Sequence, residues 1–433
     1  MSNPSIKVYD AMMGSGKTHR IINQIKDSKP EDKFLFITPI LTECHRIAGT
    51  SYEEDDPYLR PTMVGSEDGS IAYYYEEDAP LKDKLFKHPY FGSHGGKKES
   101  LPQLFRNKDN IVSTHRLFLN LTPESLKYAS DYTLIIDEML TVYEEYKEYS
   151  REELEAMMKN NWVSIDKEDG VTLKFHRDAY AANREDGSDV VKDTYYETFA
   201  TLCDLKQLML IDGKLIAWEL SIDTLKSFKE IWIASYLFEN STMSAYLKTH
   251  GLDYELIKFG KKPSEIKQLI NIYEPTKGKG INEIGLRLNS LTVSDYKKNS
   301  KTLKAQLSKN LDNYFRNYSK AKKSDRLWTT FKFAKASIET RYGDEWLALS
   351  TKATNNYKHI HNVAYLINLY PNPMLIKASA LKGFSSSQDI FALSEMIQFI
   401  WRSAIREGEP INLYVPSLRM RNLLKSWLDD QYL

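Results

Sequence analysis

The sequence predicts an α/β protein with two domains, each a parallel sheet flanked by helices, and with insertions between the core elements. The chain opens as strand, Gly-rich turn, helix and strand. Short apolar runs at 111–113, 134–136 and 231–234 follow, separated by helical stretches, and a strand–helix alternation resumes after residue 327. Buried parallel strands have this pattern. A length of 433 residues also exceeds what one compact core usually holds.

The first forty residues predict a βαβ unit. Ile6–Tyr9 is short and β-branched, and residues 11–18 form the turn. Isoleucines at 21, 22 and 25 then recur at helical spacing before a second apolar strand at Phe34–Thr38.

We place the first domain at residues 1–248 and the second at 249–433. Sections near 50–108 and 151–222 interrupt the alternation and are expected to be insertions. The second of these ends in a hairpin pattern around Asp212-Gly213. A basic helical insertion is expected near 260–325, with a lysine-rich helical pair between 294 and 323.

The net charge is zero, with 59 Lys and Arg against 59 Asp and Glu, but the charge is unevenly distributed. Residues 256–335 hold 19 basic and 6 acidic residues, a net of +13. Aromatic side chains are interleaved with them, among them Tyr273, Tyr296, Tyr314, Phe315, Tyr318 and Trp328. Such a segment can bind a single nucleic-acid strand by charge and stacking. It can equally be a solvated lysine-rich face whose aromatics pack inward.

Several classes of protein are excluded or disfavoured. No apolar run approaches the roughly 20 residues of a membrane span. Residues 1–9 lack the basic flank and apolar core of a secretory signal, so we expect a cytoplasmic protein without membrane partners. Cys44 and Cys203 are too few for a metal knuckle or a disulfide framework, and we expect both in the core.

The turn at 11–18 reads Ala-Met-Met-Gly-Ser-Gly-Lys-Thr. After a strand and before a helix, this pattern predicts a loop that binds the phosphates of ATP. The backbone of Met13, Gly14, Ser15 and Gly16 would surround the phosphates. Lys17 would reach the β- and γ-phosphates, and the Thr18 hydroxyl would bind Mg²⁺.

The apolar strand at 133–136 ends in Asp137 and Glu138. Paired with the loop about 120 residues earlier, these carboxylates predict the second half of a magnesium–nucleotide site. Asp137 would hold Mg²⁺ together with Thr18, and Glu138 would activate the attacking water.

Gln398, Arg402 and Arg406 are spaced by four residues and would share one face of a helix. An arginine brought to the γ-phosphate by a second domain stabilises the transition state of phosphoryl transfer. The alternative is a basic helix face paired with Glu395 or Glu407.

In order and spacing, these motifs resemble those of superfamily 2 helicases of the DEAD/DEAH-like type, of the kind encoded by bacteriophages and mobile elements. The resemblance implies two RecA-like domains with ATP between them and a nucleic-acid strand across both. It implies strand contacts by the residues that match the family's motifs, with Ser235 at the motif coupling hydrolysis to movement. The matching contact residues are Thr38, Pro39, Thr114, His115, Arg116, Thr330, Lys332 and Thr354.

The match departs from the family at two places. Ser235-Tyr236-Leu237 stands where the family has Ser/Thr-Ala-Thr. The family's second arginine lies seven residues after the glutamine, whereas position 405 is Ile and Arg406 follows at eight. Either Arg402 or Arg406 can therefore be the arginine finger.

The expected function is that of an ATP- and Mg²⁺-dependent helicase or translocase on single-stranded or forked DNA, working with replication proteins of a phage or mobile element. The alternative is a P-loop ATPase that acts on a protein partner as a switch or packaging-type motor. A small-molecule P-loop kinase is disfavoured, because it needs neither Thr38-Pro39 nor a distal Gln/Arg cluster.

Overall fold

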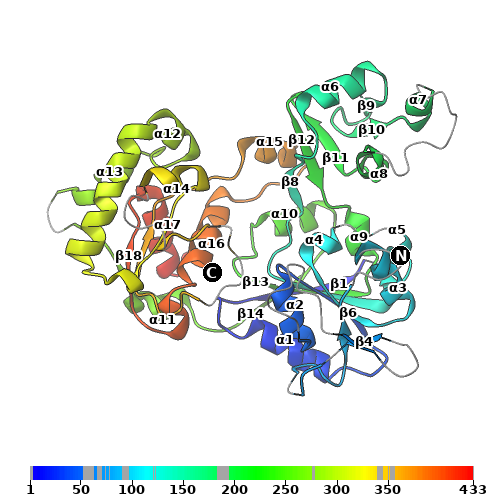
Figure 1. Ribbon diagram of the computed structural model, residues 1–433, viewed down its shortest axis with the longest axis horizontal. Helices are drawn as coiled ribbons and strands as arrows, with labels where there is room; N and C mark the ends of the chain where they lie inside the picture. Colours follow the sequence, from blue (N-terminus) through cyan, green and yellow to red (C-terminus); the bar gives the residue numbers. More distant parts are fainter. Residues whose placement is uncertain are drawn as a thin grey trace.

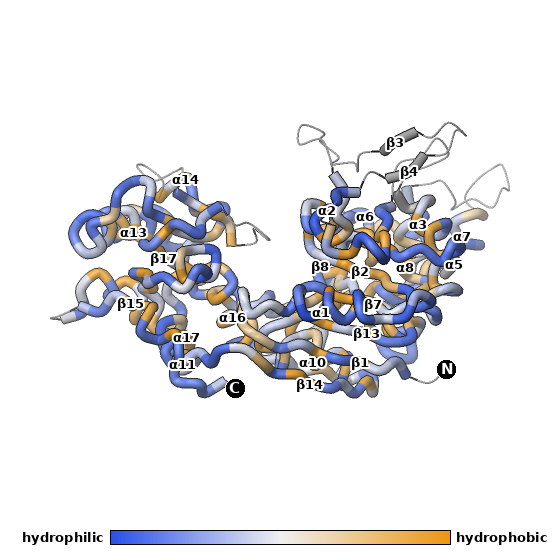
Figure 2. The backbone as a smooth tube through the Cα atoms, turned by 90° about the horizontal axis from the view of Figure 1, so that it is seen from below, coloured by the Kyte–Doolittle hydropathy of each residue, from blue (hydrophilic) through white to orange (hydrophobic). Residues whose placement is uncertain are grey.

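The computed structural model describes residues 3–51, 63–65, 71–73, 75–77, 79–89, 97–119, 121, 123–182, 195–275, 278–338, 345–349, 351 and 356–432. Two parallel sheets, of seven and four strands, form the cores of two α/β halves (Figure 1). The predicted fold class is confirmed. Figure 2 shows the hydrophobic stretches gathered in the interior of each half, for example along β2.

The first sheet has the strand order β14-β1-β13-β7-β2-β6-β5, and every neighbouring pair in it is parallel. Strand β14 lies in this sheet although the predicted domain boundary falls after residue 248, so the first half extends to Lys258. The strands are β1 (Ser5–Asp10), β2 (Lys33–Thr38), β5 (Phe86–Lys87), β6 (Asn110–Thr114), β7 (Tyr132–Asp137), β13 (Glu230–Ser235) and β14 (Glu255–Lys258).

Alternating side chains of these strands enter two cores, one on each face of the sheet. In β7, Leu134 and Ile136 join one core and Ile135 joins the other. Buried residues of α1 and α2 share the core of Ile135, and those of α4 and α10 share the opposite core. The helices of this half are α1 (Lys17–Lys26), α2 (Leu41–Ala48), α3 (Lys97–Arg106), α4 (His115–Phe118), α5 (Pro123–Leu126), α9 (Ile222–Lys226) and α10 (Thr242–Thr249).

The predicted insertion near 151–222 is a separate layer above the first sheet, at the upper right of Figure 1. The expected hairpin is present as β11 (Leu208–Ile211) and β12 (Leu215–Glu219), with Asp212 and Gly213 both at positive φ. Its other elements are β8 (Tyr143–Glu145), which pairs with β12, α6 (Arg151–Lys159), β9 (Val163–Ile165), β10 (Leu173–Phe175), α7 (Arg177–Ala181) and α8 (Glu197–Asp204). In the earlier section near 50–108, β3 (Met63–Gly65) pairs with β4 (Ile71–Tyr73).

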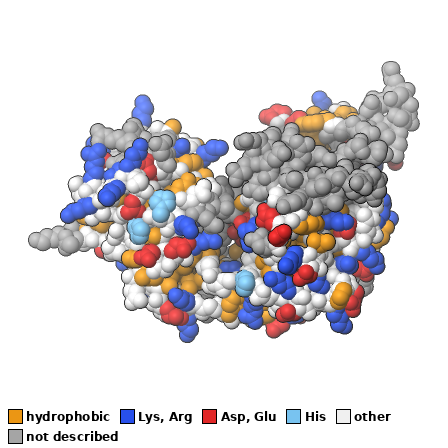
Figure 3. All heavy atoms as spheres, turned by 60° about the horizontal axis from the view of Figure 1, so that its bottom comes forward, with side chains coloured by type: hydrophobic (Ala, Val, Ile, Leu, Met, Phe, Trp, Pro, Cys, Tyr) orange, Lys and Arg blue, Asp and Glu red, His pale blue; other side chains and the backbone are white. Residues whose placement is uncertain are grey.

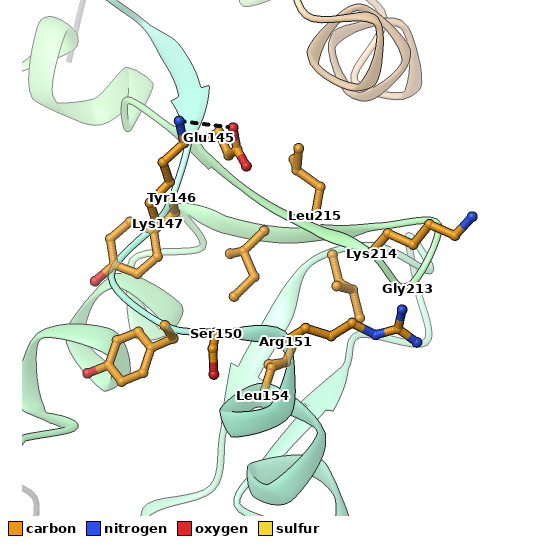
Figure 4. A pocket seen from close by; sticks show the side chains of 12 residues that line it. Glu145, Tyr146, Lys147, Ser150, Arg151, Leu154, Gly213, Lys214 and Leu215 are labelled. Carbon is orange, nitrogen blue, oxygen red and sulfur yellow. Dashed lines mark ion pairs between the residues drawn. The ribbon is translucent and has the colours of Figure 1, made fainter. Parts of the chain in front are cut away.

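A cavity of about 250 Å³ lies in this insertion, between the end of β8, the start of α6 and the hairpin (Figure 4). Tyr146 and Leu215 line it together with the basic side chains of Lys147, Arg151 and Lys214. Two of these cations are already paired, Lys147 with Glu145 at 3.3 Å and Arg151 with Glu155 at 2.7 Å.

The second sheet has the order β15-β18-β17-β16 and is also parallel throughout. Helices α12 and α13 contribute buried side chains to one core, and α16 and α17 contribute to the other. The expected lysine-rich helical pair is thus present as α12 and α13. The elements are α11 (Pro263–Ile266), β15 (Ile270–Ile272), α12 (Val293–Lys298), α13 (Ser300–Asn313), the π-helix η4 (Tyr314–Tyr318), β16 (Leu327–Thr329), α14 (Lys332–Ile338), β17 (Asn362–Tyr365), α15 (Pro373–Leu381), α16 (Gln388–Ile400), β18 (Ile411–Tyr414) and α17 (Leu418–Leu428).

Among the described residues, the halves meet in two regions. On one side, Met12 and Leu237 pack into a core built from the second sheet with α16 and α17. On the other, α15 leaves the second sheet and lies against the insertion (Figure 1). There Lys377 pairs with Asp212 at 2.7 Å, and Phe384 joins the core of the first half.

Within the part of the chain that is described, no helix combines the length and apolar character that crossing a lipid bilayer requires.

Candidate active site

The loop between β1 and α1 has the backbone geometry that its glycines predict. Gly14 and Gly16 have φ of 76° and 77°, a left-handed conformation that side chains with a Cβ rarely adopt. Gly16 is the N-cap of α1 and supplies no side-chain cap, so the first backbone N–H groups of the helix keep their capacity to bind an anion.

Lys17 begins α1 and folds back over the loop. Its Nζ donates to the carbonyl oxygens of Ala11 and Met12, the latter at 3.0 Å. Loss of hydration lowers the pKa of Lys17 to about 8, and the negative charges of Asp137, Asp10 and Glu138 oppose this shift. A phosphate group bound in the loop would therefore stabilise the charged form of Lys17, as the nearby carboxylates already do.

Thr18 and Asp137 meet across the sheet, as the two motifs predict. The Thr18 hydroxyl donates to Asp137 Oδ1 at 3.0 Å, although 119 positions separate the two residues. Loss of hydration, followed by the charge of Glu138, raises the pKa of Asp137 to about 6. Mg²⁺ is usually held by one or two protein oxygens with phosphate and water oxygens, so this pair fits the predicted ion.

Glu138 stands directly after β7 in a left-handed conformation with φ of 64°. Among non-glycine residues this conformation is uncommon and costs about 1 kcal/mol or more. Its charge acts on Asp137, Lys17 and Arg402, so its carboxylate lies within the electrostatic reach of all three.

Asp10 is a site residue that the motifs do not include. It is the last residue of β1, 8% exposed, and its Oδ2 accepts a hydrogen bond from Phe238 N at 3.3 Å. Burial raises the pKa of Asp10, and its Oδ1 has no hydrogen-bond partner in the described part of the chain. The sequence feature that could have identified Asp10 is its position directly before the loop.

The expectation that Gln398, Arg402 and Arg406 share one helical face is wrong. Helix α16 ends at Ile400, and Arg406 lies in a separate 3₁₀ turn, η7 (Ala404–Glu407). The break has a tertiary cause, because Ala404 N donates to Ile360 O at 2.8 Å instead of continuing the helix.

Both arginines nevertheless lie on the side of the second half that faces the loop. Arg402 is 7% exposed and donates to the carbonyls of Ala348 and Leu349 at 3.4 and 3.2 Å. Burial lowers the pKa of Arg402, while Glu395 and Glu138 oppose the shift. Arg406 is exposed, and a methyl group built on Gly14 would lie 4.0 Å from its carbonyl oxygen. Glu407 pairs with Lys358 at 3.9 Å.

The predicted strand-contacting residues of the first half gather at one edge of the sheet. Thr38 and Thr114 are partners in register at the ends of β2 and β6. Thr38 is fully buried, so its side chain cannot contact a strand in this conformation, and the Thr114 hydroxyl caps α4 by accepting from Leu117 N. Pro39 and His115 are half-buried and Arg116 is exposed.

The corresponding residues of the second half do not form one surface. Thr330 is 1% exposed and its hydroxyl donates to the Tyr296 hydroxyl at 3.0 Å, so it is a core residue in this conformation. Lys332 is exposed at the start of α14. Thr354 lies outside the described residues.

The prediction of an aromatic stacking track in the basic segment is wrong. Five of the six aromatics considered for stacking are buried in one core, and the exposed aromatics of the segment are Tyr318, at 49%, and Phe333, at 48%. The inward-packing alternative holds, because the aromatics continue the apolar stripe of α13 at Leu303, Leu307 and Leu311. The lysines remain outside: Figure 3 shows basic side chains spread over the left half, which is the second domain.

The fold and site define an α/β protein with two parallel sheets and a Gly-rich loop after β1, where Thr18 of the following helix donates to Asp137 at the end of β7. The chain belongs to the YonV family. It is 33% identical to the SPbeta prophage-derived uncharacterized protein YonV of Bacillus subtilis (strain 168), over 98% of this chain and 99% of that protein. The family model for the YonV C-terminal Rossmann-like domain matches residues 264–428.

Among solved structures, the chain is similar to the DUF1998 helicase MrfA bound to DNA, with a TM-score of 0.34 and 10% identity. The match covers 99% of this chain and about half, 49%, of that protein's length. MrfA bound to DNA and AMPPNP gives a TM-score of 0.33. T4 UvsW gives a TM-score of 0.23 with 8% identity, over 99% of this chain and 71% of UvsW.

Proposed function

We propose that this protein is an ATP- and Mg²⁺-dependent motor on nucleic acid, a helicase or translocase of superfamily 2 type that acts on DNA during prophage replication. The observation that carries the proposal is the hydrogen bond between Thr18 and Asp137 at the mouth of the loop. A threonine hydroxyl and a carboxylate in contact beside a phosphate-binding loop are what Mg²⁺–ATP requires. The prophage origin of the YonV relative supports the biological setting.

In this proposal each residue has a distinct task. The backbone of Met13, Gly14, Ser15 and Gly16 binds the phosphates, and Lys17 exchanges its carbonyl partners for phosphate oxygens. Thr18 and Asp137 would hold Mg²⁺, which polarises the phosphate when bound. Glu138 accepts the proton of the attacking water. Arg402 or Arg406 neutralises the charge that develops on the γ-phosphate. Gln398, on the preceding helix α16, belongs to the same motif.

Binding of nucleic acid would rest on charge more than on stacking. The segment 256–335 carries a net charge of +13, while most of its aromatics are buried or half-buried, with Tyr318 and Phe333 exposed. Arg116 and Lys332 add exposed cations at the predicted strand-binding motifs. Affinity should then depend little on sequence and steeply on salt.

The test is the steady-state ATPase rate of the full chain with and without single-stranded DNA, duplex DNA and RNA. We expect stimulation by single-stranded or forked DNA and loss of hydrolysis in Lys17→Ala. Displacement of a labelled strand from a forked duplex distinguishes a helicase from a translocase that only tracks DNA. Hydrolysis that no nucleic acid stimulates would contradict the proposal.

The burial of the aromatic residues favours a second candidate. A P-loop ATPase that acts on a protein partner needs no stacking surface, and the second half would then be its partner-binding module. This candidate predicts the same loss of hydrolysis in Lys17→Ala but no stimulation by DNA or RNA.

A further inference from the structure

An exposed phenylalanine stands close behind the strand β16, at the start of α14. The side chain of Phe333 is 48% exposed and is not among the six aromatics that were expected to stack. Its ring lies nearly parallel to that of Phe331, with an interplanar angle of 12° and 5.7 Å between the ring centroids. Single exposed apolar side chains are common on protein surfaces, so the surroundings of this ring decide what it can do.

The ring of Phe333 rests on neighbours that are themselves fixed. Phe331 is half-buried and packs against both cores of the second half. Tyr296 of α12 meets the rings of Phe331 and Phe333 edge-on, at 5.5 and 6.3 Å. The Tyr296 hydroxyl accepts from Thr330 Oγ1 at 3.0 Å and donates to Leu366 O at 2.7 Å. These contacts support Phe333 from the protein side, while nearly half of its side chain remains exposed.

The charged residues next to this ring are complementary to a polyanion. Lys332 directly precedes Phe333, and Lys297 directly follows Tyr296 on α12, which lies beside α14 (Figure 1). Both lysines are exposed, and neither forms an ion pair within the described part of the chain. The one acidic residue of α12, Asp295, is half-buried and accepts hydrogen bonds through both carboxylate oxygens. An aromatic ring beside unpaired lysines matches a strand of nucleic acid, which carries bases and phosphates together.

We propose that Phe333 stacks on a base of a single nucleic-acid strand whose phosphates are neutralised by Lys332 and Lys297. Stacking uses the face of a base and not its hydrogen-bonding edge, so the contact accepts any base. A second copy of this chain would bring its own lysines against Lys332 and Lys297, and like charges disfavour that arrangement. The inference rests on the proposed function, because it assigns one contact of the strand on which the motor would act.

The stacking contact is tested by fluorescence anisotropy of a labelled single-stranded thymidine oligonucleotide with the full chain, without added ATP. Phe333→Ala should weaken binding about 5- to 150-fold, as expected when one stacked base loses its aromatic partner. Phe333→Leu keeps an apolar side chain without a ring and should weaken binding similarly, whereas Phe333→Trp should retain the affinity. Unchanged affinity in Phe333→Ala, or full affinity in Phe333→Leu, would overturn the proposal.

Salt dependence and an abasic strand separate stacking from charge. Phe333→Ala removes no phosphate contact, so the slope of log affinity against log salt should stay the same, whereas Lys332→Gln should reduce it by roughly 0.7. A strand of abasic sites keeps the phosphates and lacks the bases, so it should bind equally to Phe333→Ala and to the unchanged protein. If Phe333→Ala weakens binding of the abasic strand as much as that of the thymidine strand, Phe333 does not stack on a base.

Tyr318→Ala is the matched control. Tyr318 is an aromatic residue of the same basic segment with an equal exposure of 49%, and it lies after the end of α13 with its ring against Tyr273. This variant should keep the affinity of the unchanged protein for the thymidine strand. Melting curves of all variants check folding. An equal loss of affinity in Tyr318→Ala would mean that removal of any exposed aromatic has the effect, and the assignment to Phe333 would fail.

ATPase measurements distinguish failure of this inference from failure of the proposed function. Stimulation by single-stranded DNA together with unchanged strand binding in Phe333→Ala would support the motor and refute the stacking contact. Strand binding that depends on Phe333, without stimulation of hydrolysis, would support the stacking contact and contradict the motor. If the unchanged protein binds no strand, the inference fails, and a dimer that Phe333→Ala dissociates in sedimentation would identify a second copy as the occupant of this surface.

Discussion

Glu138 combines a strained backbone with a carboxylate that the proposed chemistry needs. Its left-handed φ of 64° follows directly on the buried strand β7. A glycine would adopt this conformation at lower cost. A side chain retained there, within reach of the charges of Lys17 and Arg402, is what a positioned general base would require.

Glu138→Gln should slow ATP hydrolysis by about 10²- to 10⁴-fold while leaving Mg²⁺–ATP binding intact, because the amide keeps the shape and loses the basicity. Single-turnover hydrolysis and equilibrium binding of ATP measure the two effects separately. Glu148→Gln, an exposed carboxylate of the same half, is the control and should behave as the unchanged protein. Loss of ATP binding in Glu138→Gln would show a structural role instead.

Asp137 should make stability depend on pH in the absence of Mg²⁺. Its folded-state pKa of about 6 lies above the unfolded value of 3.8, so the folded state holds the proton more tightly. The contribution of Asp137 to the free energy of unfolding is therefore largest below about pH 4. It decreases by up to about 3 kcal/mol as the pH rises through about 6. In urea unfolding, the free energy of unfolding of Asp137→Asn relative to that of the unchanged protein should increase between about pH 4 and pH 6. Above about pH 6 this difference should be constant.

Addition of Mg²⁺ provides the control for that pH dependence. The ion binds the deprotonated carboxylate, so it should offset the loss above about pH 6 in the unchanged protein but have no such effect in Asp137→Asn. Equal pH profiles for the two proteins would mean that Asp137 titrates at its ordinary value.

The sequence could locate these residues because their pattern is local. Gly14, Gly16 and Lys17 lie within one turn. Asp137 directly follows an apolar run that is recognisable as a strand from the local sequence alone. Asp10 was missed because its role comes from Phe238, which lies 228 positions away and donates to it. No local pattern encodes that contact.

At the scale of elements, the end of α16 shows where sequence periodicity fails. The spacing of Gln398, Arg402 and Arg406 predicts a helix, but the bond from Ala404 N to Ile360 O ends it. In α13 the periodicity was informative. The stripe of Leu303, Leu307 and Leu311 marks the buried face, and its continuation into the aromatics favours the inward-packing interpretation over the stacking one.

Replacing Arg402 and replacing Arg406 should have different effects on the melting temperature as well as on the ATPase rate. Arg402→Ala removes a buried guanidinium that is bonded to two backbone carbonyls, so it should lower both the melting temperature and the ATPase rate. Arg406→Ala changes an exposed side chain and should lower kcat with little effect on KM or melting temperature. Unchanged DNA-stimulated turnover in Arg406→Ala would leave Arg402 as the candidate finger.

The basic face of α12 and α13 should bind strands by charge alone. Changing Lys297, Lys298, Lys301 and Lys304 to Gln should reduce the slope of log affinity against log salt by roughly 0.7 for each phosphate that these lysines no longer neutralise. Three of these lysines are exposed and Lys304 is half-buried, so their replacement should not disturb the core. Fluorescence anisotropy with single-stranded DNA at several salt concentrations measures the slope.

The matched control for that experiment is the pair Lys26→Gln and Lys29→Gln, two exposed lysines at the end of α1 and the turn after it. An equal change of slope in this pair would mean that net charge, and not the face of α12 and α13, determines binding.

At the scale of the whole molecule, the halves are joined at two places that differ in chemistry. Lys377 and Lys382 pair with Asp212 and Asp169 of the insertion, contacts whose partly exposed ion pairs are each worth about 1 kcal/mol or less. Near the P-loop the contact is buried, with Met12 and Leu237 inside the second core. The α15 contact also has a buried part, because Ala378 and Phe384 lie in the core of the first half, so its ion pairs are the part that should loosen at least cost.

Tyr236 is the polar link at that buried contact. It follows Ser235, the last residue of β13, and its hydroxyl accepts from Trp427 Nε1 on α17 at 2.6 Å. Tyr236→Phe leaves the ring in place and removes this bond, which should cost about 1 to 3 kcal/mol. Because the bond joins the halves, we expect a larger loss of DNA-stimulated turnover than of the basal ATPase rate.

Tyr246→Phe separates coupling from stability. The Tyr246 hydroxyl likewise takes part in a 2.6 Å hydrogen bond, here as the donor to Leu220 O, but both residues lie within the first half. The two variants should lose similar stability, so melting curves serve to match them. If only Tyr236→Phe loses stimulation by DNA, the link to Trp427 transmits nucleotide state between the halves. If both variants lose it equally, destabilisation explains the effect, and the departure of Ser235-Tyr236-Leu237 from the helicase pattern has no part in coupling.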